Sequence, residues 1–435
     1  MAKKVEHAAK MDLMTYLKKG TNPFSVVEAS AEWLEEDGFE KLSFGETWKL
    51  KAGKRYYTIP YKTTLFAFAI GEDFRPGKPI HMACAHTDHP CLRIKPAAEM
   101  TDHGYQKLDI EVYGGPILNT WLDRPLSIGG RIMLKSEDVY HPIERMLDIG
   151  EPICIIPNLA IHMNREVNKG VELNKQTEML PLFGLAGETA DAAFFRNYLA
   201  DRLDCAETDI LDFDLYLYNA ELPDRLGANK EMLSSPRLDN LTSCYAAVNG
   251  ITRGASKDRL QVIVLFDNEE IGSRTKQGAD SLLANFLLQK VYRGLGADPD
   301  LLADSLADSM VLSLDVAHAY HPNYGSKSDP NLKCIMGQGP AIKINYNQKY
   351  ATDTEAIAIL QQLCLVEGIP FQKYVNRSDQ PGGGTLGTIT SGYLPMKTVD
   401  LGIPILAMHS SRELMGYEDQ EHLNRLVEAF FSEKA

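Results

Sequence analysis

One short apolar run constrains this chain more than any other stretch. Val262–Phe266 is rich in β-branched residues and is followed at once by Asp267-Asn268-Glu269-Glu270. Such a run is typical of a strand buried on both faces, as in the sheets of α/β proteins. Open α/β sheets place their sites at the carboxyl ends of such strands. An isolated Glu-Glu pair is more often a solvated loop feature, so the interpretation of Glu269 and Glu270 depends on the rest of the chain.

The bulk composition indicates a soluble globular protein of two or three domains. The chain has 435 residues, of which 44% are hydrophobic, enough for sizeable cores. It has no run of 18 apolar residues and no apolar signal stretch at its start, so we expect a cytoplasmic protein that does not span a membrane. A formal charge of -14 argues against nucleic acid as a partner. Seven scattered cysteines without a CxxC pair favour buried reduced thiols over disulfides or a thiolate zinc site.

Periodicity predicts helices and strands in alternation, with a β-rich region between them. Helices are predicted within 10–37, with a break at Gly20 and Asn22-Pro23, and between Asp239 and Gly254. Two more are predicted over 280–294 and 353–367. Strands are predicted over 64–70, 81–85, 310–315, 341–346 and 404–408. The region 91–235 holds short β-rich runs (107–113, 132–134 and 153–159), a helix over 190–203, and a strand over 212–218 that returns to the main body. We therefore expect an α/β fold with an inserted β-rich domain.

Other predicted strands also end on polar side chains. The strand 81–85 is followed by His86-Thr87-Asp88, and residues two apart in an extended chain point the same way, so Asp88 can orient His86. A lone His-x-Asp is more often an ordinary hydrogen-bonded pair. The strand 310–315 ends on Asp315, and the strand 404–408 leads into His409. Asp239 opens a helix, where a role as N-cap is the simpler interpretation.

Together these side chains predict a metal centre at one edge of a sheet. Five His, Asp and Glu ligands exceed what one tetrahedral ion takes up while leaving a catalytic position open, which favours two ions that share a carboxylate. Zinc suits the nitrogen and oxygen donors, and Mn²⁺ or Co²⁺ can substitute. A carboxylate that is not a ligand must accept the proton of the activated water. Glu269 and Glu270 can therefore divide the roles of base and ligand.

Six motifs carry a family resemblance, each weak alone and specific together. They are His86-Thr87-Asp88, Pro236-Arg237-Leu238-Asp239-Asn240, Asp267–Ser273, Asp315–Ala319, His321–Tyr324 and Ala407–Ser410. In this order, from about residue 86 to 413, they resemble the aspartyl aminopeptidase family of dinuclear zinc exopeptidases. The resemblance implies a zinc-exopeptidase-like mixed sheet flanked by helices, formed by 1–90 and 236–435. An inserted β-rich dimerisation domain would occupy 91–235.

The resemblance also implies how the ligands are shared. Asp239 would bridge two divalent ions per subunit, His86 and Asp315 would complete one site, and Glu270 and His409 would complete the other. The peptide bond between Asp239 and Asn240 would be cis, which would aim the bridging carboxylate.

Further roles are implied beside the metals. Glu269 would be the general base, and Asp88 would orient His86. Substrate contacts are implied for four residues: His162, His318, Lys343 and Tyr350. Of these, His162 would reach the active site of a neighbouring subunit.

The function implied is that of a metalloaminopeptidase that releases N-terminal residues from peptides, with dimers assembled into a tetrahedral dodecamer. Lys343 offers a cation for an acidic (Asp or Glu) side chain, yet it could equally be a surface lysine or a structural lysine oriented toward a carboxylate. His89 and Gly382-Gly383-Gly384 depart from the family's usual residues. They leave the acidic preference open, because some relatives prefer neutral residues such as leucine.

Two rival functions use the same features. A dinuclear zinc carboxypeptidase or amide deacylase would have identical metal chemistry and a different substrate clamp. A non-catalytic assembly or cargo-binding relative would keep the fold without the reaction, although all proposed ligands and the base are present.

Overall fold

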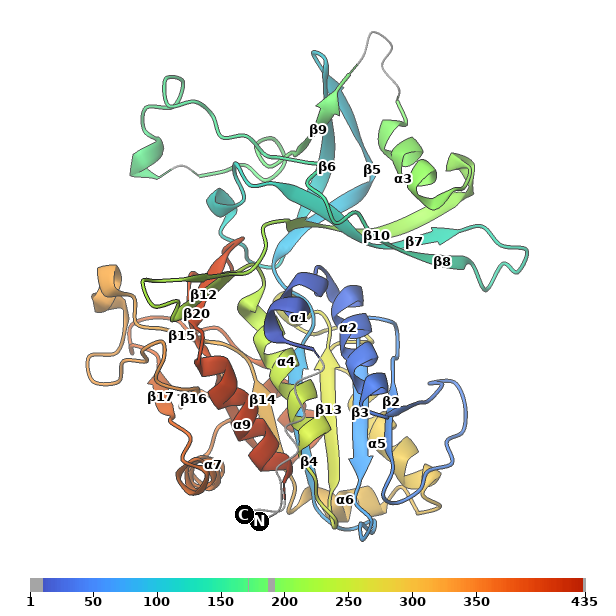
Figure 1. Ribbon diagram of the computed structural model, residues 1–435, viewed down its shortest axis with the longest axis vertical. Helices are drawn as coiled ribbons and strands as arrows, with labels where there is room; N and C mark the ends of the chain where they lie inside the picture. The colour runs from blue at the N-terminus through green and yellow to red at the C-terminus, as the bar shows by residue number, and fades with distance from the viewer. Residues whose placement is uncertain (1–10, 171, 187–191, 433–435) are drawn as a thin grey trace. The chain divides into compact units, whose positions relative to one another are not determined.

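The computed structural model describes residues 11–170, 172–186 and 192–432, and it divides the chain into two compact units (Figure 1). The first unit consists of 1–89, 223–408 and 413–435, and the second of 90–222 and 409–412. Residues 1–10, which bear on the signal-peptide prediction, and 190–191, at the start of a predicted helix, lie outside the described residues. Residues 223–235, which we predicted to belong to the insertion, fall in the first unit.

A nine-stranded mixed sheet forms the centre of the first unit. Its order is β1 (Glu40–Lys41), β2 (Arg55–Thr58), β3 (Leu65–Ile70), β13 (Leu260–Phe266), β4 (Ile80–His86), β14 (Met310–Leu314), β18 (Lys397–Gly402), β16 (Ala341–Ile344) and β17 (Gln372–Val375). The four strands β13, β4, β14 and β18 run parallel. Every residue of β13 is buried, which confirms the predicted strand and, with the helices below, the α/β class.

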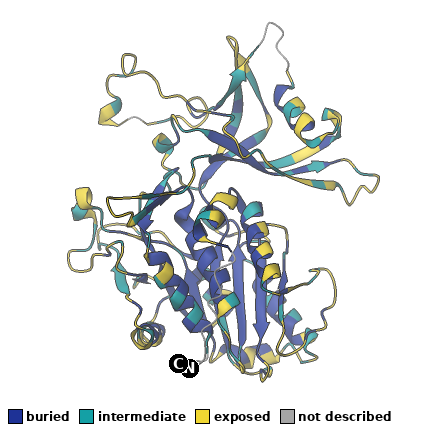
Figure 2. Ribbon diagram, viewed as in Figure 1, coloured by how far each residue is buried: buried dark blue, intermediate teal, exposed yellow. Residues whose placement is uncertain are grey.

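Helices cover both faces of this sheet because its strands are apolar on both sides. Ile263 and Leu265 pack in one core with α1 (Leu13–Lys19), α2 (Pro23–Glu36), α4 (Leu238–Arg253), α7 (Thr354–Glu367) and α9 (Asp419–Phe431). Val262 and Val264 pack in the other with α5 (Leu283–Gly294), α6 (Leu301–Leu306) and α8 (Leu386–Tyr393). Figure 2 shows the central strands buried along most of their length. The predicted break between the first two helices is confirmed, since Asn22 caps α2 and Pro23 begins it.

A smaller sheet also belongs to the first unit. Its order is β11 (Asp224–Leu226), β12 (Met232–Ser235), β20 (Glu413–Gly416), β19 (Pro404–Leu406) and β15 (Ala317–His318). We expected the apolar run 404–408 to join the main sheet, and this was wrong, while the role of His409 after it stays a prediction. The strand beside β14 is β18, while β19 pairs with β20 and β15. An apolar run reveals a strand but not the sheet that it joins.

The second unit is built on a six-stranded antiparallel sheet. Its order is β8 (Ile143–Asp148), β7 (Leu126–Leu134), β10 (Ile210–Asn219), β5 (Cys91–Asp102), β6 (Tyr105–Tyr113) and β9 (Leu182–Leu185), with α3 (Phe194–Leu203) beside it. The prediction that 212–218 returns to the main body was wrong, because β10 pairs along its length with β7. Residues 153–159 form only isolated bridges instead of the expected strand. In the part of the chain described, no helix is long and apolar enough to cross a membrane.

Candidate metal centre and active site

Three parallel strands deliver the candidate residues to one edge of the main sheet. His86 is the last residue of β4 and lies in register with Phe266, the last residue of β13. The turn after β13 leads into a short 3-10 helix, η4 (Glu269–Ile271), and Asp315 directly follows β14. Since parallel strands share the direction of their carboxyl ends, these residues meet at the same edge, as the sequence predicted.

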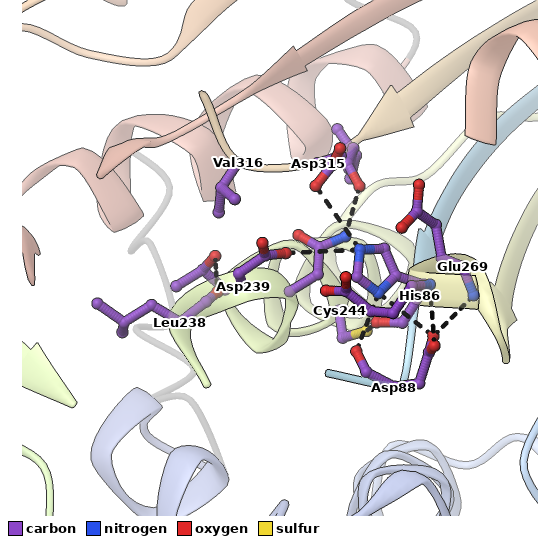
Figure 3. A network of polar contacts seen from close by, with 12 residues as sticks. His86, Asp88, Leu238, Asp239, Cys244, Glu269, Asp315 and Val316 are labelled. Atoms are coloured by element: carbon purple, nitrogen blue, oxygen red, sulfur yellow. Dashed lines mark hydrogen bonds and ion pairs between the residues drawn. The ribbon is translucent and has the colours of Figure 1, made fainter. Parts of the chain in front are cut away.

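His86 lies at the centre of the group and is 1% exposed. Its Nε2 lies 3.5 Å from Oδ1 of Asp239 and 3.6 Å from Oδ1 of Asp315 (Figure 3). Its Nδ1 lies 3.0 Å from the carbonyl oxygen of Asp88 and 3.4 Å from Oδ1 of the same residue. Because Nδ1 faces these oxygens, Nε2 is the nitrogen that is turned toward Asp239 and Asp315.

The donor set and its spacing fit a divalent metal ion. One ligand atom from each of His86, Asp239 and Glu270 lies within 4.8 Å of the others. Imidazole nitrogen with carboxylate oxygen is a donor set that zinc accepts, and Mn²⁺ or Co²⁺ can occupy such sites. Placing several carboxylates close together away from water costs free energy unless cations compensate their charge. The residues present therefore suit a cationic cofactor.

Asp88 holds the two glutamates as well as the imidazole. Its side chain is fully buried. Oδ1 accepts a hydrogen bond from the backbone N–H of Glu269 at 3.1 Å, and Oδ2 accepts one from the N–H of Glu270 at 3.1 Å. Hydrogen bonds to a charged acceptor are stronger than neutral ones. A single carboxylate thus fixes the backbone of both glutamates, a contact that the His-x-Asp spacing did not predict.

Asp239 is held by its backbone. The peptide bond between Asp239 and Asn240 is cis, as the resemblance implied. The N–H of Asp239 donates to Oε2 of Glu413 at 3.0 Å, and Glu413 is 3% exposed. Sequence reasoning missed Glu413. The available signal was the alternation along the short strand Glu413–Gly416. Glu413 lies two residues before Met415, which is apolar and buried, so the two side chains share the buried face.

Burial and the crowded carboxylates shift the pKa values of this group of side chains. Burial, together with the carboxylates of Asp315, Asp88 and Asp239, raises the pKa of Glu269 to about 8, although His86 opposes this shift. Burial alone would lower the pKa of His86, but the carboxylates of Asp315 and Asp88 raise it well above its ordinary value. Burial is the largest cause of the rise at Glu269, whereas the rise at His86, which occurs against burial, reports the negative charge of Asp315 and Asp88.

Two predicted site residues belong to the second unit. His409 falls in the segment 409–412, and its Nδ1 lies 3.1 Å from the carbonyl oxygen of Gly115. His162 is exposed and lies between β8 and β9. Their proposed roles in metal binding and in a neighbouring active site stay predictions.

The other predicted substrate contacts are divided between a buried pair and an exposed residue. Lys343 and Tyr350 are 2% and 4% exposed, so the interpretation of Lys343 as a surface lysine was wrong. His318 is exposed and lines a cavity of about 350 Å³. Other residues lining this cavity are His321, Tyr324, Lys327, Asp329, Tyr374, Asn376, Arg377 and Met408.

Comparison with known proteins identifies the family. The profile of the aminopeptidase I zinc metalloproteases (M18) matches residues 16–431. The chain belongs to the M18 family. A probable M18 family aminopeptidase 2 from Clostridium novyi is 41% identical over 423 residues, covering 97% of this chain and 98% of the relative.

Solved M18 structures share the fold. The chain matches a structure of the complex of Ape4 and Nbr1 with a TM-score of 0.91 and 34% identity, over 96% of this chain and 84% of that one. It matches the mApe1 dodecamer of S. cerevisiae with a TM-score of 0.84 and 27% identity, over 96% and 95% of the two chains. These findings confirm the resemblance, the mixed α/β fold and a metal-dependent aminopeptidase.

Proposed function

We propose that this M18 aminopeptidase hydrolyses the first peptide bond of peptides with two divalent ions, most naturally Zn²⁺, and with Glu269 as general base. Asp239 would bridge the ions, His86 and Asp315 would complete one site, and Glu270 and His409 the other. The observation that carries the proposal is the approach of ligand atoms of His86, Asp239 and Glu270 to within 4.8 Å.

The chain's own residues account for the movement of the proton. When bound, the ions would lower the pKa of a water molecule and polarise the scissile carbonyl. Glu269 would accept the proton of that water and pass it to the leaving amine. Divalent cations favour the ionised form of a nearby carboxylate, so they would counter the raised pKa of Glu269. Asp88, by holding two consecutive N–H groups, would keep the base and the ligand in a fixed relation.

An acidic N-terminal residue is the preferred substrate in this proposal. The cavity that His318 lines also has Lys327, Arg377 and the acid Asp329 among its lining residues, and Arg377 is paired with Asp379 at 2.6 Å. In a chain with a formal charge of -14, Lys327, with His318 and His321 when they are protonated, would be the groups of this cavity that attract a negatively charged guest.

We also propose a homo-oligomer, with dimers assembled into a tetrahedral dodecamer through the second unit. The segment around His162 exposes large apolar side chains: Leu159, Ile161 and Met163 are 52%, 51% and 70% exposed. Clustered exposed apolar residues are typical of interaction surfaces. A dodecamer has been solved for mApe1, and sedimentation of the purified chain would test the assembly here.

The central test is hydrolysis of unblocked Asp, Glu, Leu and Lys aminoacyl substrates by chelated enzyme resupplied with Zn²⁺, Mn²⁺ or Co²⁺. Metal-dependent release should occur, with Asp and Glu favoured, and Glu269→Gln should lower kcat by about 10²–10⁴-fold while the bound metal is retained. A metal count of two per subunit would support the dinuclear centre. A count of one would contradict it.

The rival functions separate in the same assay. Acetylation of the peptide's N-terminus should abolish hydrolysis by an aminopeptidase, whereas a carboxypeptidase or deacylase would still act. A folded chain that binds no stoichiometric metal and releases no amino acid would favour the non-catalytic alternative.

A further inference from the structure

Arg237 is a buried cation in the turn that leads into α4, two residues before Asp239. Its Nε donates to the carbonyl oxygen of Gly20 at 2.8 Å, and its Nη2 donates to the carbonyl oxygen of Leu17 at 3.2 Å. A guanidinium keeps its charge in proteins, so its burial costs free energy unless its N–H groups find acceptors. The two carbonyl oxygens supply part of what this side chain requires.

Both acceptors belong to the carboxyl end of α1. Leu17 lies in the last turn of this helix, and Gly20 is its C-cap. The last carbonyl groups of a helix have no N–H partner within it and carry partial negative charge, so a basic side chain is favourable there. Arg237 therefore joins the end of α1 to the turn before Asp239, although 217 residues separate Arg237 from Gly20 in the sequence.

The backbone of Arg237 has a conformation that requires such an anchor. Its φ is 61° and its ψ is 31°, which is the left-handed region. A residue with a side chain adopts this region at a cost in free energy, and it persists only where the surrounding structure fixes it. If the guanidinium lost its acceptors, the turn would be free to relax, and the backbone that carries Asp239 would move with it.

Other contacts hold Asp239 from its far side. Its N–H donates to Oε2 of Glu413, and Nδ2 of the next residue, Asn240, donates to the carbonyl oxygen of Leu314 at 2.9 Å. Between these supports, Oδ1 of Asp239 lies 3.5 Å from Nε2 of His86 (Figure 3). Glu413 and Leu314 thus fix the chain at and after Asp239, and Arg237 fixes the turn before it.

We infer that Arg237 is a positioning residue for the metal centre, because it anchors the turn that carries Asp239 to the carboxyl end of α1. The inference rests on the proposed role of Asp239 as the bridging ligand. It makes the N-terminal helix part of the support of the site, although α1 contributes none of the proposed ligands. Since a bridging carboxylate serves both ions, loosening this turn should weaken the binding of both.

The test compares Arg237→Met with two controls. Arg253→Met changes an exposed arginine at the other end of α4. Tyr16→Phe removes the hydroxyl that pairs with Oγ of Ser30 at 2.7 Å, so it loosens α1 against α2 and leaves Arg237 in place. In a competition titration with a chelator, Arg237→Met should weaken zinc binding by about 10–100-fold, as for other residues that orient ligands. Both controls should keep the parental zinc affinity.

A conservative variant separates positioning from stability. Arg237→Lys keeps the charge and loses the planar fork of donors, so it should recover part of the zinc affinity. A role in stability alone would lower the Tm of Arg237→Met and leave the zinc affinity of the folded protein unchanged, and that result contradicts the inference. If Arg237→Met does not fold, Arg237→Lys decides. Zinc binding weaker than in Tyr16→Phe supports the inference, and parental binding contradicts it.

Asp239→Asn distinguishes failure of this inference from failure of the proposed function. If Asp239→Asn loses bound zinc while Arg237→Met binds zinc as the parent does, the inference is wrong and the proposed ligand stands. If Asp239→Asn still binds two zinc ions per subunit with parental affinity, the bridging role of Asp239 is wrong, and the inference about Arg237 falls with it.

Discussion

Two histidines on the same strand occupy opposite environments. His81, near the start of β4, stacks on the ring of Phe430 with centroids 4.5 Å apart, and its Nδ1 lies 2.8 Å from the carbonyl oxygen of Phe430. Burial lowers the pKa of His81 to about 4. His86, at the end of the strand, has a raised pKa because carboxylates surround it.

The difference arises from what the neighbouring strands contribute at each edge of the sheet. His81 lies in register with Gln261 and Met310, whereas His86 lies beside the ends of β13 and β14, where acidic residues follow. Both residues lie on one strand, His81 partly buried and His86 buried. Position at the carboxyl edge, and not residue type, therefore distinguishes a candidate ligand from a structural histidine.

The largest expected effect would come from removing each histidine in turn. His86→Ala should lose bound zinc and at least about 1,000-fold in kcat/KM, because metal stabilisation of the transition state amounts to several kcal/mol. His81→Ala should keep its zinc content and most of its activity. Elemental analysis and aminoacyl hydrolysis would measure both. Equal losses of zinc and of kcat/KM in the two variants would show that His81 and His86 do not differ in this way.

A smaller effect is expected at Asp88, which belongs to the carboxyl edge without being a proposed ligand. Asp88→Asn leaves one oxygen where two accept the N–H groups of Glu269 and Glu270. We expect a loss of about 10–100-fold in kcat, measured at saturating zinc. Asp258→Asn, at an exposed position near the other end of the sheet, is the matched control and should be neutral. Unchanged kcat in Asp88→Asn would mean that the glutamates are held by other contacts.

His162 extends the comparison to an exposed histidine of the second unit. If it reaches a neighbouring active site, His162→Ala should lower kcat/KM by roughly 10-fold without changing the Tm, and only in the assembled enzyme. His141→Ala is a suitable control, because that side chain is 81% exposed on the same unit. A normal kcat/KM in His162→Ala would make His162 an ordinary surface residue.

The last prediction concerns stability, and not activity, at the other edge of the sheet. Because the folded pKa of His81 is about 4 and that of an unfolded histidine about 6.5, the unfolded chain binds more protons between these values. Stability is therefore lost as pH falls from about 6.5 toward 4, by at most about 1.4 kcal/mol per pH unit. His81→Phe should remove this loss. The Tm of the variant minus the Tm of the parent should therefore increase as the pH is lowered from 7 to 4.5. A constant difference would show that His81 is not the titrating group.

The sequence predicted the residues of the carboxyl edge better than their partners. Apolar runs that stop at a polar residue reveal β4, β13 and β14, because strands buried on both faces have few polar residues. The same rule misses β18, whose Thr398 and Asp400 are buried and polar. The carboxylate of Asp400 accepts hydrogen bonds from the hydroxyl of Thr385 and the N–H of Ala351. No local sequence pattern predicts partners so distant in the chain.

The same limit applies to Lys343. Its sequence neighbours Ile342 and Ile344 predict a strand but not the depth at which its ammonium lies, since its partner Asp315 comes from another strand end. Three interpretations of this lysine were open from sequence, and its burial removed one of them.

The order of the site residues along the chain has a consequence for biosynthesis. His86 leaves the ribosome before the whole of 90–222 has been made, and Asp315 follows roughly 230 residues later, which takes tens of seconds at about 5–20 residues per second. During that interval the end of β4 lacks the strands and carboxylates that later surround it. Metal binding at the proposed centre would therefore have to wait for the second half of the polypeptide, because a nascent chain that stops at residue 222 contains only His86 of the five proposed ligands.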